Sequence, residues 1–76
     1  MSLKITVRDA KSGAVVDLNV EDENTVGEII EGVARYWQVD AGASMLRHGE
    51  KVLGTEETVA EAAIQDGDML DLVHER

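Results

Sequence analysis

The chain has no cysteine and no proline among its 76 residues. Without cysteine it cannot form a disulfide, a thiolate nucleophile or a thiolate metal site. No stretch approaches the roughly 18 consecutive apolar residues of a membrane span, and the N-terminal residues alternate in polarity instead of forming a signal-peptide core. We therefore predict a soluble, cytoplasmic protein without membrane insertion.

Basic residues are also scarce: seven Lys and Arg stand against sixteen Asp and Glu, for a net charge of −9. This acidic excess argues against nucleic-acid phosphates or an anionic membrane as the main partner. A charge of this size also keeps a small domain soluble without any further role. A length of 76 residues predicts one domain, residues 1–76, whose core is a single layer of side chains. We expect a monomer that does not bind nucleic acid.

The stretch from Thr25 to Val39 predicts the long helix around which the rest of the chain is organised. Thr25 and Glu28 have the spacing of a capping box, in which each residue's side chain bonds the other's backbone N–H. Apolar residues recur at helical spacing and define one buried face. They are Val26, Ile29, Ile30, Val33 and Trp37.

Alternating polarity predicts strands on both sides of this helix. Residues 2–8 and 14–20 form a hairpin, and residues 44–48, 51–53 and 68–74 form the later strands. A second capping-box pattern in residues 55–64 predicts a short helical turn. The order predicts an α+β fold in which a mixed sheet of four to five strands packs on the helix, with the first and last strands parallel at its centre.

The facing of the later strands decides which side chains are exposed. In the strand 44–48 we predict that Met45 points inward and Leu46 outward. In the last strand we predict that Leu70 and Leu72 point inward, while Met69 and Val73 point outward.

This order and its segments resemble the ubiquitin-like β-grasp superfamily. The resemblance is carried by KITV, LNV, TVGEII, MLRHGEKV, TVAEAAI and DGDMLDLV, in that order along the chain. It implies a single ubiquitin-like domain. The ending AAIQDGDMLDLV is similar to prokaryotic ubiquitin-like proteins of the EsaB and YukD type. That similarity implies an accessory role in type VII secretion or another multiprotein system.

The resemblance also implies a test at the C-terminus, because ubiquitin-like modifiers and sulfur carriers end in Gly-Gly. Here the last glycine is Gly67 and the sequence ends Val73-His74-Glu75-Arg76. We therefore expect a non-conjugating, non-catalytic interaction module. Two alternatives stay open: a modifier or sulfur carrier whose glycine tail is missing, and a small regulatory subunit of a multicomponent enzyme.

Ubiquitin receives most of its receptors on an apolar patch of its open sheet face. By position Ala10, Leu46 and Val73 would stand on that patch, and Met69 is a further outward apolar residue. We predict that these four residues bind a protein partner. Positions flanking this patch that are typically basic or neutral in ubiquitin are here Ser44, Glu50, Asp71 and Glu75. Because like charges repel across an interface, we expect a partner with a basic surface.

Candidate chemical sites are few. His48 and His74 lie on different strands with no carboxylate or third ligand suggested by spacing, so we expect exposed strand ends. The run Glu21-Asp22-Glu23 lacks the ligand spacing and central glycine of an EF-hand loop. No serine has a nucleophile motif around it, and no glycine-rich phosphate loop is present. We predict no catalytic, cofactor or metal site, and no enzyme activity.

Overall fold

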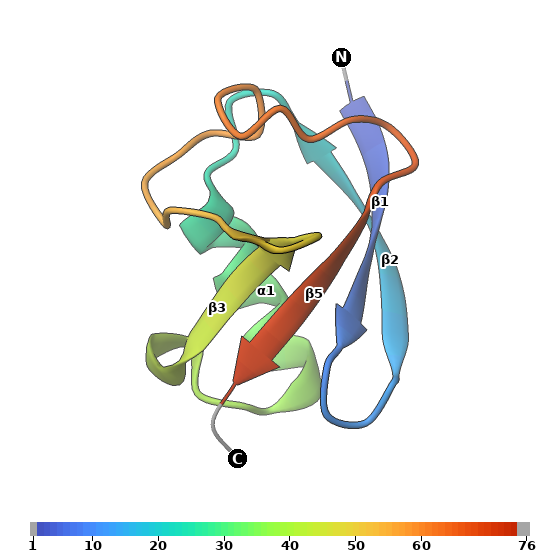
Figure 1. Ribbon diagram of the computed structural model, residues 1–76, viewed down its shortest axis with the longest axis vertical. Coiled ribbons are helices and arrows are strands. Elements are labelled where there is room, and N and C mark those ends of the chain that lie inside the picture. Colours follow the sequence, from blue (N-terminus) through green and yellow to red (C-terminus); the bar gives the residue numbers. More distant parts are fainter. Residues whose placement is uncertain (1, 75–76) are drawn as a thin grey trace.

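The computed structural model describes residues 2–74, which form a five-stranded sheet, one α-helix and a short 3-10 helix. Their bounds are β1 Ser2–Asp9, β2 Val15–Glu21, α1 Val26–Trp37, η1 Ala41–Ala43, β3 Ser44–His48, β4 Lys51–Val52 and β5 Met69–His74. Figure 1 shows α1 lying behind the sheet, so one sheet face is covered and the other is open. No helix within residues 2–74 has the length and apolar character needed to cross a membrane.

The sheet has the strand order β2-β1-β5-β3-β4. β1 pairs with β5 in parallel, whereas the β1–β2, β3–β5 and β3–β4 pairs are antiparallel. The first and last strands therefore lie side by side within the sheet, as Figure 1 shows. The predicted α+β class, mixed sheet and parallel pairing are confirmed.

The helix begins as its sequence predicts. Thr25 Oγ1 accepts the Glu28 N–H at 3.1 Å, and the Glu28 carboxylate accepts the Thr25 N–H at 3.0 Å. The backbone N–H groups of the first two helical residues have no partner within the helix and donate to a segment distant in sequence. Val26 N–H donates to the Glu57 carbonyl, and Gly27 N–H donates to the Thr55 carbonyl. The helix ends at Trp37, two residues before the predicted Val39, because the following residue is in the left-handed conformation with φ 59°.

The predicted short helical turn in residues 55–64 is present as a single hydrogen-bonded turn and not as a regular helix. Its capping box is present, with reciprocal bonds between Thr58 and Glu61. Ala62 N–H donates to the Thr58 carbonyl and Ala63 N–H to the Ala60 carbonyl, and the turn ends at Ala63, which has φ 59°. The segment also packs Val59 and other apolar side chains into the core. The 3-10 helix η1 lies between α1 and β3, where we predicted neither a helix nor a strand.

The core lies between the sheet and α1. It consists of inward residues of β1, β2, β3 and β5, the buried face of α1 and the apolar residues of the 53–64 segment. Its buried members are Ile5, Val7, Val20, Val26, Ile29, Ile30, Val33, Leu46, Leu53, Val59, Ala62, Ile64, Leu70 and Leu72. Trp37 packs against this cluster but stays partly exposed.

Candidate functional site

The open face of the sheet carries the candidate site, and the strand register decides which side chains meet there. Met45 of β3 lies opposite Val73 of β5, and Arg47 lies opposite Asp71. On the other side of β5, Arg8 of β1 lies beside Asp71. Because alternate side chains share a face, these five residues form two adjacent rows on the open face. One row is the apolar pair Met45 and Val73, and the other is the charged row Arg8–Asp71–Arg47.

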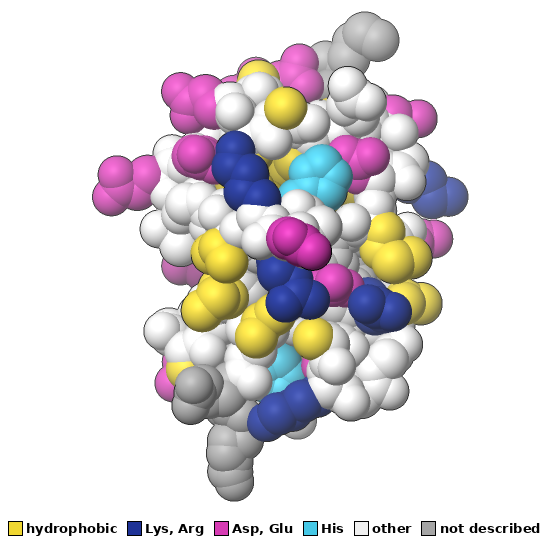
Figure 2. Space-filling model, in the orientation of Figure 1, with side chains coloured by type: hydrophobic (Ala, Val, Ile, Leu, Met, Phe, Trp, Pro, Cys, Tyr) yellow, Lys and Arg dark blue, Asp and Glu magenta, His cyan; other side chains and the backbone are white. Residues whose placement is uncertain are grey.

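Apolar side chains are exposed on this face. Met45 is 44% exposed and Met69 is 52% exposed, and Val52 beside Arg47 is also exposed. Val73 is half-buried. Figure 2 shows hydrophobic side chains on this face together with Lys and Arg, while most of the acidic side chains in view lie toward its margin.

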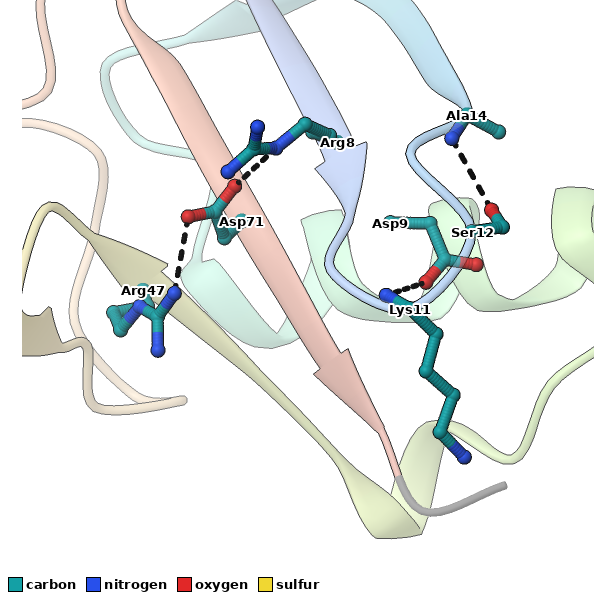
Figure 3. Close-up of polar contacts among 7 residues, drawn as sticks. All are labelled: Arg8, Asp9, Lys11, Ser12, Ala14, Arg47 and Asp71. Atoms are coloured by element: carbon teal, nitrogen blue, oxygen red, sulfur yellow. Dashed lines mark hydrogen bonds and ion pairs between the residues drawn. The ribbon is translucent and has the colours of Figure 1, made fainter.

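Asp71 is held between two arginines, as Figure 3 shows. Arg8 Nε donates to Asp71 Oδ1 at 3.0 Å, and Arg47 donates to Oδ2 at 3.2 Å. The Arg8 hydrogen bond is the largest influence on the pKa of Asp71; burial opposes it, Arg47 adds to it, and the net pKa is lowered. The carboxylate is therefore ionised at neutral pH. One carboxylate beside two guanidiniums leaves this row with a net positive charge in an acidic protein.

The predicted facing of β3 is wrong. Leu46 is fully buried and lies opposite Leu72, whereas Met45 is on the open face. Two apolar residues are adjacent in this short strand, so polarity alone leaves two possible phases that differ by one residue. Pairing with β5 selects the phase, and a shift of one residue exchanges the faces of every side chain.

The other predicted site residues lie at the surface, but on opposite sides of the charged row. Ala10 is exposed beyond β1, and its N–H donates to the Leu72 carbonyl, which places it near Val73. Met69 is at the opposite end of β5. The sequence-based reasoning missed Met45 and the role of the two arginines. The missed signal was Arg47: this charged residue lies two positions from Met45, shares its face of the strand, and therefore favours the open face for both side chains.

The two histidines are not free strand ends, contrary to prediction. His74 Nε2 lies 3.0 Å from Asp9 Oδ1, and the His74 side chain is only 7% exposed. Its Nδ1 is buried without a hydrogen-bond partner in residues 2–74. His48 Nε2 lies 3.2 Å from Asp68. Across the described part of the chain, no three His, Cys, Asp or Glu side chains gather in a way that could hold a metal ion.

Asp9 joins the end of β5 to the turn after β1. Burial raises the pKa of this carboxyl, but hydrogen bonds from the Lys11 N–H, from His74 and from the Ser12 N–H together outweigh it and lower the pKa. The Lys11 contact is 2.8 Å long and is drawn in Figure 3. Through its contacts with His74 and Lys11, the Asp9 carboxylate holds the end of β5 against the turn that follows β1.

Solved structures with the same fold include ubiquitin and ubiquitin-like domains. The chain is similar to Caldiarchaeum subterraneum ubiquitin, with a TM-score of 0.92, 23% identity and coverage of 100% of this chain and 96% of that chain. It is also similar to the ubiquitin-like domain of Plasmodium falciparum Dsk2, with a TM-score of 0.88, 19% identity and coverage of 99% and 100%.

A third similar structure is a protein designed on ubiquitin, with a TM-score of 0.84, 24% identity and coverage of 93% of this chain and 85% of that chain. No protein-family model matches the chain, and no curated protein does. The predicted ubiquitin-like β-grasp fold is confirmed.

Proposed function

We propose that this chain is a protein-interaction module that binds its partner through the open face of the sheet. The observation that carries the proposal is the apolar pair of exposed Met45 and half-buried Val73 beside the Arg8–Asp71–Arg47 row. Large exposed side chains on adjacent strands supply apolar area for a partner. Arg and Met are also enriched in protein interfaces.

The charge of the row sets the chemistry of the partner. Our sequence-based prediction of a basic partner treated Asp71 as a free negative charge. Because two arginines pair with that carboxylate, we propose instead that the partner places carboxylates beside an apolar contact. Such a match would raise the association rate and make binding sensitive to salt.

Ubiquitin-like folds are typically non-catalytic, and we propose that this chain is neither an enzyme nor a conjugated modifier. We further propose that it acts in the cytoplasm as an accessory factor of a multiprotein system such as type VII secretion. The resemblance of its sequence to proteins of that type is the support for this setting.

Affinity capture from host lysate with matched variants tests the binding face. Met45→Asp should lose the partner, whereas Tyr36→Asp, at an exposed helix position, should retain it. Arg47→Glu should weaken capture most at low salt. Retention of the partner by Met45→Asp would refute the proposed face. A ladder of covalent, mass-shifted forms of the endogenous protein would instead support a modifier, and co-purification with a large enzyme subunit would support a regulatory subunit.

A further inference from the structure

The charged row on the open face continues across all five strands of the sheet. Arg8 of β1 lies opposite Val15 of β2, and Arg47 of β3 lies opposite Val52 of β4. Asp71 of β5 is in the middle, between the two arginines. Val15 and Val52 are both exposed. An apolar side chain therefore closes each end of the row.

Apolar side chains also lie along both sides of the row. Met69 and Val73 are the residues two positions before and after Asp71 on β5, and Met45 lies opposite Val73. Because alternate residues share a face of a strand, all three side chains are on the same face as Asp71. Figure 2 shows hydrophobic side chains on both sides of the basic ones on this face. Together with the two valines they form an apolar ring around the charged row. The apolar ring consists of Val15, Met45, Val52, Met69 and Val73.

Asp71 holds both guanidiniums at the centre of this ring, as Figure 3 shows. The Asp71 side chain is only 15% exposed, whereas the side chains of Arg8 and Arg47 are much more exposed. Within residues 2–74, Asp71 is the only ion-pair partner of either arginine. The Nε of Arg47 is buried and has no hydrogen-bond partner in the same residues. Each guanidinium has more N–H donors than its contact with Asp71 uses. The arginines therefore keep donors for a partner, while their position depends on Asp71.

We propose that Asp71 is a positioning residue, which holds Arg8 and Arg47 as one binding site for a single carboxylate within an apolar segment of the partner. The inference rests on the proposed function, because it concerns the same face. A glutamate or aspartate of the partner accepts hydrogen bonds from the outer N–H groups of the two arginines, and its apolar neighbours cover the apolar ring. Two guanidiniums and one carboxylate leave one net positive charge, which matches one incoming carboxylate. Because the ring excludes water around this contact, the charge-assisted hydrogen bonds are strengthened.

The positioning role and the charge of Asp71 predict opposite effects of Asp71→Asn. By charge alone, removing the carboxylate should strengthen the binding of an anionic ligand, because the net positive charge of the row increases. If Asp71 positions the arginines, its removal should weaken the binding of the same ligand. The two guanidiniums then repel each other without an anion between them and separate.

Two synthetic peptides serve as probes. One carries a single glutamate with leucines on both sides and serines at its ends, and the matched control carries glutamine in place of the glutamate. In a titration of the isotope-labelled chain followed by NMR, both should shift the amides of Met45, Met69 and Val73. The glutamate peptide should bind about tenfold more tightly, because hydrogen bonds to a charged group are stronger than neutral ones. This preference should fall as salt is added.

Asp71→Asn and Asp17→Asn form a matched pair of variants. Asp17 is on the same face, where its carboxylate accepts a hydrogen bond from the Thr6 hydroxyl at 2.6 Å. Asp17→Asn therefore removes the same charge without removing a partner of either arginine, and it should bind the glutamate peptide at least as tightly as the original chain. Asp71→Asn should bind that peptide about tenfold more weakly. It should also lose the preference for glutamate over glutamine, which a general loss of structure would not remove selectively.

Four results would overturn the proposal. The first is tighter binding of the glutamate peptide by Asp71→Asn than by the original chain. The second is an equal weakening of both peptides in Asp71→Asn. The third is equal binding of both peptides by the original chain, and the fourth is the absence of saturable shifts on the open face. The proposed function is tested separately, by capture of the partner with the original chain and its loss in Met45→Asp, so the two proposals can fail independently.

Discussion

Replacing Leu46 with alanine should destabilise this protein severely while leaving its open face intact. Leu46 has an exposed fraction of 0% and faces the core opposite Leu72. Truncating a buried leucine to alanine costs about 2–5 kcal/mol, from lost burial and the cavity that remains. A 76-residue domain has a free energy of unfolding of about 4–11 kcal/mol. The substitution therefore removes a large part of the total.

The adjacent residue provides the matched control. Met45 is 44% exposed on the opposite face, so Met45→Ala should change the free energy of unfolding by no more than about 0.5 kcal/mol. A loss of about 3 kcal/mol in Leu46→Ala corresponds to a drop of about 12–24 °C in the melting temperature of a domain of this size.

Thermal and urea unfolding, followed by circular dichroism and by the fluorescence of the partly buried Trp37, measure both variants. Coincident transitions from the two probes would justify a two-state free energy. If Leu46→Ala melted within a few degrees of the original chain while Met45→Ala lost stability, the phase of β3 described above would be wrong.

Three further predictions concern stability. Asp9 and Asp71 have folded-state pKa values below their ordinary 3.8. The two ionised carboxylates therefore add to the free energy of unfolding above pH 3.8, and this stabilisation is lost as the pH falls through their lowered pKa values. In urea titrations, the difference in free energy of unfolding between the original chain and Asp71→Asn should narrow on acidification. Thr25→Ala removes the helix cap and should cost about 1 kcal/mol by urea unfolding, and an unchanged midpoint would contradict that role. Gly32→Ala should gain up to about 1 kcal/mol, whereas Gly27→Ala should gain less or lose, because its Cβ would lie 3.1 Å from the Thr55 carbonyl oxygen; equal melting temperatures would refute the contrast.

Local patterns were sufficient to predict the α+β class and most of the elements. The alternation around Ile5 and Leu70 spans several residues, so a wrong phase would expose several apolar side chains at once. The Thr25 capping box needs only residues three apart and formed as predicted. The capping box at Thr58 also formed, and the segment after it makes a single turn, as its short length predicted.

The sequence by itself determined the strands, the helix start and the division between core and surface along most of the chain, because periodic polarity and capping act over a few residues. Only the tertiary structure decided the phase of β3, the Arg8–Asp71–Arg47 row and the pairing of His74 with Asp9. These depend on the register between strands that are far apart in sequence. Register is set by the whole core packing at once, so no single segment contains the information that places those side chains together.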